Sequence, residues 1–165
     1  MIDRRTVALT SLSAAAAMVF GRSYANAAGP KTNAFEITKS PEEWQKVLSA
    51  EQFYVLRKHG TERAGTSPLD KVYTAGVYNC AGCELPVFTS ETKFDSGTGW
   101  PSFYAPIENA IGTSVDKSLW STRTEVHCRR CGGHLGHVFP DGPKPTGLRY
   151  CMNGVALKFA AKASS

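Results

Sequence analysis

Two kinds of hydrophobic pattern follow each other along the chain after its first forty residues. Between residues 40 and 60, apolar side chains recur at helical spacing behind two serines, Ser40 with Glu43 three positions later and Ser49 with Gln52 three positions later. A serine followed at this distance by Glu or Gln forms a capping box at a helix start. The pattern predicts two short helices that cover one side of the core, the second ending at Gly60.

Beyond Pro68 the pattern changes to short runs of β-branched and aromatic residues. These runs are separated by glycine, proline, serine and threonine, and they lie at 72–73, 77–78, 87–88, around 126, 135–139 and 155–159. Such runs are typical of short antiparallel strands. We therefore expect an α+β fold that is mainly β.

The first 28 residues have the pattern of an export signal. Arg4 and Arg5 precede an uncharged, alanine-rich stretch of 14 residues from Val7 to Phe20, and Ala27 closes an A-x-A cleavage site. A bilayer-spanning helix needs about 20 residues, which disfavours the alternative of a retained membrane anchor. We expect cleavage near Ala27 and export, to the periplasm.

The paired arginines suggest the twin-arginine route of export. A phenylalanine is usual in that signal where this chain has Val7 or Ala8, so the general secretory route stays open as an alternative. The remaining chain is expected to contain a flexible lead-in at 29–39, one domain at 40–160 and a short tail at 161–165. A formal net charge of +5, scattered along the chain, is too small to indicate nucleic-acid binding.

The five cysteines divide into four and one. Cys80 and Cys83 form one C-x-x-C pair, and Cys128 and Cys131 form a second. Two such pairs indicate a tetrahedral zinc site with four thiolate ligands, which is structural because no position stays open for substrate. Two disulfides, or one redox-active C-x-x-C pair, are the alternatives. Cys151 is left over.

A single unpaired cysteine in an exported protein suggests a reactive thiol, with a buried apolar cysteine as the alternative. Arg149 lies two residues before Cys151 and would share its face of a strand, where it could stabilise a thiolate. Asn153 lies two residues after Cys151 and could direct its amide to the same space. The neighbours therefore favour reactivity.

Several separated stretches resemble the B-type methionine sulfoxide reductases. They are His-Gly-Thr-Glu-Arg at 59–63, Phe-Asp-Ser-Gly-Thr-Gly-Trp-Pro-Ser-Phe at 94–103, Gly-Gly-His-Leu-Gly-His-Val-Phe-Pro-Asp-Gly-Pro at 132–143, Gly-Leu-Arg-Tyr-Cys-Met-Asn at 147–153, and the two cysteine pairs. The resemblance runs from about residue 40 to residue 159. It implies two small antiparallel sheets with helices packed against them, called a β-tent, and reduction of the R epimer of methionine sulfoxide.

The resemblance also implies site residues. The nucleophile of the family falls on Cys151, its tryptophan on Trp100, its histidines on His134 and His137, and its asparagine on Asn153. We further expect Phe103 and Arg149 to contact substrate.

Chemistry supports these roles, because a thiolate that attacks a sulfoxide needs a proton donor for the departing oxygen. His137 is the natural donor. His134 and Asn153 could hold the oxygen, and Trp100 offers a flat wall to the methyl group. Asp141 is expected either to orient a histidine or to cap a turn.

This chain departs from the family pattern at one position. Many members have a second, resolving cysteine two residues before the tryptophan, and this chain has Thr98 there. The sulfenic acid formed on Cys151 would then be reduced by an external thiol. A thioredoxin-like protein, glutaredoxin or glutathione are the candidate reductants, and we expect the enzyme to be a monomer.

Two other functions fit parts of the sequence. A zinc-ribbon module that binds nucleic acid or protein would leave Cys151 and Trp100 unexplained. A zinc hydrolase would need an open metal position, which four thiolates do not leave. His134 and His137 could also be a metal pair, but their spacing in a regular strand would place them on opposite faces.

Overall fold

The computed structural model describes residues 35–118 and 121–163. The predicted export signal and the first part of the predicted lead-in lie outside these residues. In the described ranges, no helix combines the length and the apolar character that a membrane span requires.

Both predicted helices are confirmed, and their capping boxes explain where they begin. Helix α1 covers Pro41–Val47 and α2 covers Ala50–Lys58. The Glu43 N–H donates to the Ser40 hydroxyl at 3.2 Å, and the Ser40 N–H donates to the Glu43 carboxylate at 2.7 Å. Ser49 and Gln52 form the same pair of bonds at the start of α2. Helix α2 ends on His59 in a left-handed conformation, one residue before the predicted stop.

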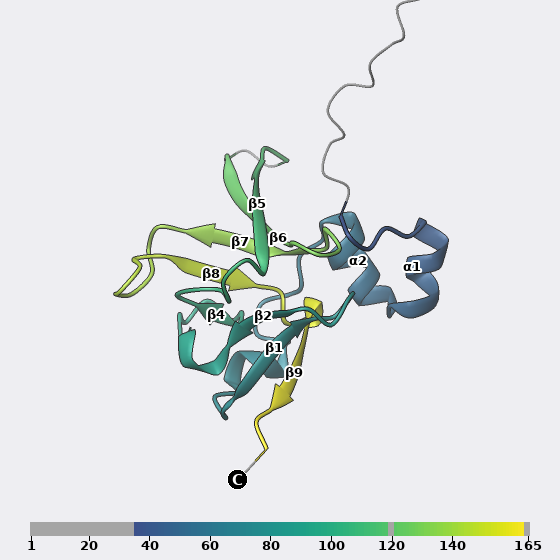
Figure 1. Ribbon diagram of the computed structural model, residues 1–165. Coiled ribbons are helices and arrows are strands. Elements are labelled where there is room, and N and C mark those ends of the chain that lie inside the picture. Colours follow the sequence, from purple (N-terminus) through teal and green to yellow (C-terminus); the bar gives the residue numbers. More distant parts are fainter. Residues whose placement is uncertain (1–34, 119–120, 164–165) are drawn as a thin grey trace, which may run out of the picture. The chain divides into compact units, whose positions relative to one another are not determined.

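The strands form two antiparallel sheets (Figure 1), as the fold prediction states. The smaller sheet has the order β2 (Pro86–Thr89), β1 (Gly76–Cys80), β9 (Leu157–Ala161). The larger sheet has the order β3 (Lys93–Phe94), β4 (Ser102–Phe103), β8 (Arg149–Met152), β7 (His134–Phe139), β6 (Arg123–Cys128), β5 (Ile111–Asp116). Three 3-10 turns lie between these elements: η1 (Pro68–Lys71) between α2 and β1, η2 (Ser90–Thr92) between β2 and β3, and η3 (Gly154–Ala156) between β8 and β9.

Two of the predicted strands differ from the observed elements. Residues 72–73 form no strand, and the Val72 carbonyl instead accepts a hydrogen bond from the Tyr78 hydroxyl at 2.8 Å. The run at 155–159 begins as η3 and becomes strand only at Leu157. Strands β3, β4, β5 and β8 had no clear signal in the sequence, because β3 and β4 are two residues long and the other two carry mixed polar residues.

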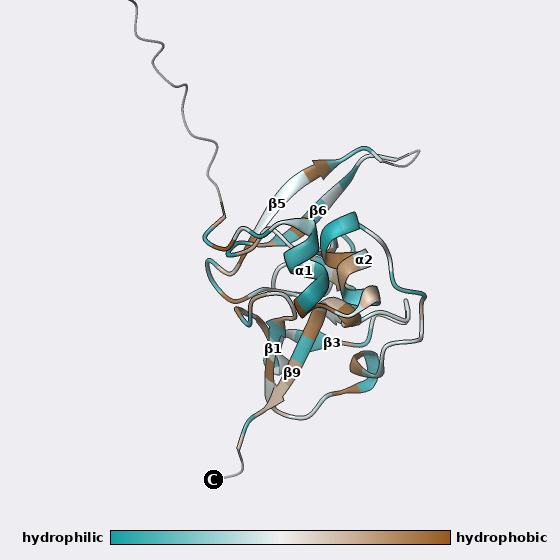
Figure 2. Ribbon diagram, turned by 90° about the vertical axis from the view of Figure 1, so that its right-hand side faces the viewer, coloured by the Kyte–Doolittle hydropathy of each residue, from teal (hydrophilic) through white to brown (hydrophobic). Residues whose placement is uncertain are grey.

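Aromatic side chains from both sheets form the centre of the core. Phe88 of β2 stacks on Phe103 of β4 with ring centroids 4.4 Å apart, and Tyr78 of β1 meets Phe103 edge to face at 5.0 Å. Burial raises the pKa of Tyr78 to about 12. Helix α2 adds the buried Val55 and Leu56, while most of α1 has hydrophilic colour in Figure 2. The two sheets are therefore held in fixed positions around one core.

Candidate active site and metal centre

Cys151 lies at the centre of the larger sheet. It is paired with Ser102 of β4 on one side and with His137 of β7 on the other. Gly136 permits the approach of β7 to β8, because a Cβ at this position would overlap the Cys151 carbonyl oxygen. The half-buried Cys151 lines a cavity of about 120 Å³. Further lining residues are Thr61, Trp100, Arg123, Gly136, His137, Phe139, Met152 and Asn153.

The indole of Trp100 forms a wall of this cavity in a fixed orientation. Its Nε1–H donates to the Glu62 carbonyl at 3.0 Å. The Glu62 N–H donates to the Asn153 side-chain oxygen at 2.8 Å, and the Asn153 side-chain nitrogen donates to the Leu135 carbonyl at 3.1 Å. Asn153 is thus already bonded to two segments of the protein, and it positions the segment that holds the indole.

The prediction that His134 and His137 point to opposite faces is wrong, and a β-bulge is the reason. Val126 pairs with Gly136 while His127 pairs with His134, so Leu135 is an extra residue in β7. An extra residue shifts the alternation of side chains by one position. The two imidazoles therefore meet edge to face, with ring centroids 5.2 Å apart. Only His137 lines the cavity; His134 lies behind it and is buried.

A carboxylate that the sequence analysis missed holds His137. The Oδ2 atom of Asp116, on β5, lies 2.7 Å from His137 Nε2 and 2.7 Å from the Arg123 guanidinium. Burial lowers the pKa of His137, and the hydrogen bond to Asp116 partly offsets this effect. The pKa of Asp116 lies well below its usual range, chiefly because of hydrogen bonds from Ser118, with His137 contributing.

His134 has a carboxylate partner of its own, which the sequence analysis also missed. Its Nδ1 lies 2.8 Å from Oε1 of Glu125 on β6, and His59 Nδ1 lies 2.9 Å from the same oxygen. The Ser114 hydroxyl donates to the other carboxylate oxygen at 2.6 Å. Hydrogen bonding to His134, the largest cause, lowers the pKa of Glu125 to about 2. The two histidines therefore have separate carboxylates, which argues against a shared metal.

Replacing Glu125 by Gln is expected to flatten the acid limb of the stability profile. A carboxyl whose folded-state pKa falls from 4.5 to about 2 contributes stability above pH 4.5 and loses it as the pH falls toward 2. That contribution is on the order of 3 kcal/mol at neutral pH. Thermal unfolding of both proteins between pH 2 and pH 7 measures it. Parallel acid limbs in the two profiles would contradict the assignment of the shift to Glu125.

Phe103 and Arg149, which were predicted to contact substrate, do not line the Cys151 cavity. Phe103 is fully buried in the core and does not line the cavity, because neighbouring residues of β4 point to opposite faces. The Arg149 guanidinium forms a bidentate ion pair with Asp141 at 2.9 and 2.8 Å and lies over Phe139. Asp141 thus neither orients a histidine nor caps a turn. The pKa of Arg149 is raised chiefly by Asp141, with a smaller effect from nearby Cys151.

Thr98, at the position of the family's resolving cysteine, is a neighbour of the Cys151 sulfur. Its Oγ1 lies 3.8 Å from Cys151 Sγ. Ser96 connects it to Ser102 through hydroxyl contacts of 2.8 and 2.7 Å. The Cys151 sulfur therefore faces a hydroxyl group at the position of the resolving cysteine.

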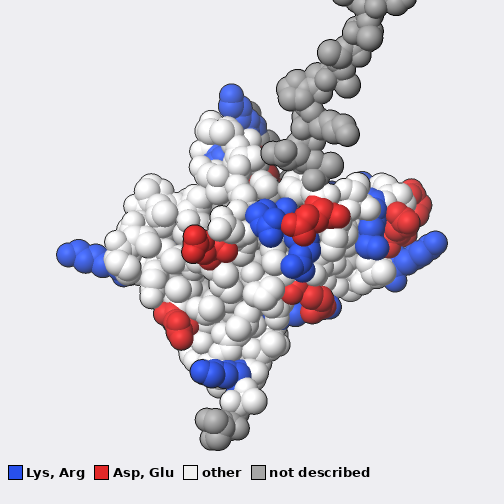
Figure 3. Space-filling view, in the orientation of Figure 1, with Lys and Arg blue, Asp and Glu red and all other residues white. Residues whose placement is uncertain are grey.

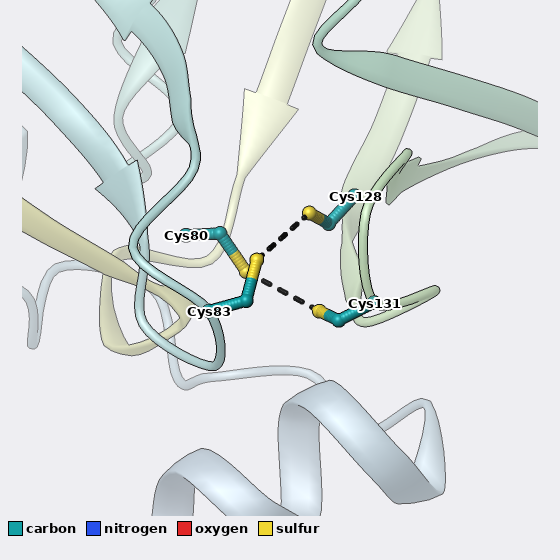
Figure 4. Close-up of side chains that lie close together, drawn as sticks. All are labelled: Cys80, Cys83, Cys128 and Cys131. Carbon is teal, nitrogen blue, oxygen red and sulfur yellow. Dashed lines mark hydrogen bonds between the residues drawn. The ribbon is translucent and has the colours of Figure 1, made fainter. Parts of the chain in front are cut away.

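The two cysteine pairs form one cluster that joins the two sheets (Figure 4). Cys80 is the last residue of β1, and Cys83 lies on the turn that follows. Cys128 is the last residue of β6, and Cys131 lies on the turn that follows. The Cys80 and Cys131 sulfurs are 3.7 Å apart, and those of Cys83 and Cys128 are 3.4 Å apart. None of the five cysteines, all of which lie in the described residues, is in a disulfide. A disulfide requires about 2.05 Å between its sulfurs.

The geometry of this cluster fits a tetrahedral metal site. Sulfurs bound to one zinc ion at about 2.3 Å lie about 3.8 Å from each other. The four cysteine sulfurs of this cluster lie within 4.8 Å of one another. Arg57 supports the site, because its guanidinium donates to the Cys131 sulfur at 3.2 Å and to the Cys131 carbonyl at 2.9 Å while it stacks on Trp44. The cluster could therefore hold one metal ion.

On the face that Figure 3 shows, the charged side chains do not gather into a site of one sign. Acidic and basic residues are interspersed there, and neither sign forms a broad patch. This distribution agrees with the small net charge and gives no support to nucleic-acid binding.

Comparisons with known proteins point to one family. The SelR domain model matches residues 48–161. "Peptide methionine sulfoxide reductase MsrB" of Pseudomonas syringae pv. syringae (strain B728a) is 54% identical over 129 residues, which cover 78% of this chain and 98% of the relative. The protein of the same name from Pseudomonas putida (strain W619) is 56% identical, covering 75% and 94%. "Peptide methionine sulfoxide reductase B1, chloroplastic" of Arabidopsis thaliana is 55% identical, covering 74% and 61%.

Proposed function

Because this chain belongs to the SelR-domain family of peptide methionine sulfoxide reductases, we propose that its reaction begins with attack of the Cys151 thiolate on the sulfoxide sulfur. The observation that carries this proposal is the position of Cys151 in one small cavity with Trp100 and His137. A zinc-ribbon binding module would have no use for that arrangement.

The reaction requires one proton at the sulfoxide oxygen. Asp116 holds His137 at Nε2, so a doubly protonated ring offers the proton on Nδ1. The attack forms a bond between the Cys151 sulfur and the methionine sulfur. This bond breaks as the protonated oxygen moves from the methionine sulfur to the Cys151 sulfur, which yields methionine and Cys151 sulfenic acid. The cysteine sulfur is oxidised by two electrons and the sulfoxide sulfur is reduced by two.

We expect the enzyme to consume only the R epimer of methionine sulfoxide. Trp100 can take the methyl group on one side of the cavity while His137 takes the oxygen on the other, so the epimer of opposite hand would direct its oxygen toward the indole. The resemblance to the B-type reductases assigns R as the accepted epimer. The test is an assay on racemic methionine sulfoxide with dithiothreitol, followed by chiral separation of the remaining substrate. Half of the racemate should remain, all of it S. Consumption of both epimers at equal rates would reject the assignment.

A single-cysteine cycle is proposed for the recycling of the enzyme. With Thr98 beside Cys151 and the other four cysteines in the cluster, an external thiol is the expected reductant of the sulfenic acid. After one turnover without reductant, a sulfenic-acid probe should label Cys151 in nearly every molecule. As a matched control, Thr98→Cys is expected to lose the label and gain a disulfide between the introduced thiol and Cys151. An intramolecular disulfide in the unmodified protein would contradict this cycle.

We also propose that the metal of the cysteine cluster is zinc. Cys80, Cys83, Cys128 and Cys131 would hold it, and it would contribute folding energy rather than chemistry. The predicted export signal supports the further proposal that the enzyme repairs oxidised proteins in the periplasm. We also propose that it is a monomer and that a thioredoxin-like protein, glutaredoxin or glutathione is its reductant. Cell fractionation with N-terminal sequencing of the recovered protein tests the export and the cleavage near Ala27.

A further inference from the structure

A groove much larger than the catalytic cavity lies directly beside it. Its volume is about 860 Å³, against about 120 Å³ for the cavity that contains Cys151. Helix α2, residues 61–69, η3 and β9 contribute its lining. The reaction described above concerns one side chain only, so it leaves this groove without a role.

The groove and the catalytic cavity share a wall. Thr61 lines both of them. The neighbouring Glu62 also lines the groove; its carbonyl holds the Trp100 indole, and its carboxylate accepts a hydrogen bond from the Val155 N–H at 2.9 Å. Asn153 lines the cavity, and the next two residues line the groove. A ligand in the groove therefore reaches the segment that positions the indole.

Strand β9 presents an unpaired edge beside this groove. It is the last strand of its sheet, next to β1, in the part of the chain that the structure describes (Figure 1). The Ala81 N–H donates to the Ala156 carbonyl, and the Lys162 N–H donates to the Ala75 carbonyl. The backbone N–H and C=O groups of successive strand residues point in alternate directions. Those of even-numbered residues from 156 to 162 therefore point toward β1, and those of odd-numbered residues point away from it.

Phe159 is the residue at which edge and groove meet. It is odd-numbered, so its N–H and C=O point away from β1, and its side chain lines the groove with that of Leu157. Figure 2 looks onto β9, which has hydrophobic colour over most of its length. Backbone groups for pairing and an apolar surface for alternate side chains thus lie side by side, as strand addition requires.

We propose that the groove binds an extended segment of the oxidised substrate protein, which adds to β9 as a fourth strand while its methionine sulfoxide enters the Cys151 cavity. The inference rests on the proposed function. Main-chain pairing is independent of sequence, which suits an enzyme that must accept methionine in many contexts. The sheet is antiparallel throughout, and antiparallel addition at β9 places the bound segment on the N-terminal side of the methionine.

Kinetics on peptides test the inference. We would compare N-acetyl-methionine-R-sulfoxide methylamide with peptides that extend it by two, four or six residues on either side. Each hydrogen bond to Phe159 and Ala161 should add affinity, so KM is expected to fall by about tenfold with N-terminal extension alone. N-methylation of the peptide backbone at alternate positions should restore the higher KM, and methylation at the positions between them should not.

A variant of the edge gives the matching test on the protein. Ala161→Pro removes an N–H that faces away from β1, and edge strands tolerate proline at such positions. It should raise KM for the long peptide severalfold and leave the methylamide unchanged, whereas Ala163→Pro, beyond β9, should change neither. In Cys151→Ser saturated with the long peptide, hydrogen exchange of the Phe159 amide should slow by about tenfold.

The outcomes separate this inference from the proposed function. If the methylamide is reduced but no extension lowers KM, the groove does not bind substrate, although the enzyme assignment stands. An extension effect that ignores N-methylation would reject strand addition. If no substrate is reduced at all, the proposed function is wrong, and the inference that rests on it is rejected with it. Protection of the Phe159 amide by an added thiol reductant, and not by peptide, would assign the groove to the reductant instead and overturn the inference.

Discussion

Cys151→Ser is expected to lower the turnover of methionine sulfoxide by about a thousandfold or more. Serine keeps nearly the same shape, but its hydroxyl stays protonated at neutral pH and attacks sulfur poorly. No other cysteine can replace it, because the remaining four lie in the cluster that joins the sheets. A dithiothreitol-coupled assay on the R sulfoxide measures the loss.

The same variant provides its own structural control. Cys151 is only half-buried, and its backbone pairing with Ser102 and His137 does not depend on the sulfur. We therefore expect its metal content and thermal unfolding temperature to match those of the unmodified protein. A Cys151→Ser protein that retains more than about a tenth of the activity would refute the nucleophile, since such losses are far larger when a nucleophile is removed.

Cys80→Ser is expected to have the largest effect on stability. Cys80 is fully buried, and its cluster joins the turn after β1 to the turn after β6. Structural zinc in small domains contributes roughly 10–16 kcal/mol of apparent binding energy at pH 7. That range matches or exceeds the roughly 5–15 kcal/mol by which whole domains are stable. We expect loss of the metal and unfolding well below the melting temperature of the unmodified protein.

Metal analysis and differential scanning calorimetry check this prediction. Cys151→Ser is the matched control, because it makes the same exchange of sulfur for oxygen outside the cluster. A chelator should reproduce the effect of Cys80→Ser in the unmodified protein, and added zinc should reverse it. Unchanged metal content and unchanged unfolding in Cys80→Ser would mean that the cluster is not a structural metal site.

Local signals in the sequence predicted the features that depend on neighbours in the chain. Ser40 and Ser49 with their Glu and Gln partners marked both helix starts, because a capping box is complete within four residues. The C-x-x-C spacing marked each half of the cysteine cluster for the same reason. Residue motifs also placed Cys151, Trp100 and His137 together, although the resemblance to a family, rather than spacing, joined these distant segments.

By itself, the amino-acid sequence determined the helix starts, most of the strands, the two halves of the metal cluster and the unpaired thiol. Tertiary structure alone decided the rest. The bulge at Leu135 turns His134 and His137 to one face, and strand pairing brings Asp116 and Glu125 from β5 and β6 to those histidines. Packing places Phe103 in the core rather than at the Cys151 cavity. The physical reason is that hydrogen-bonded register between strands relates residues far apart in the chain, and no local pattern specifies that register.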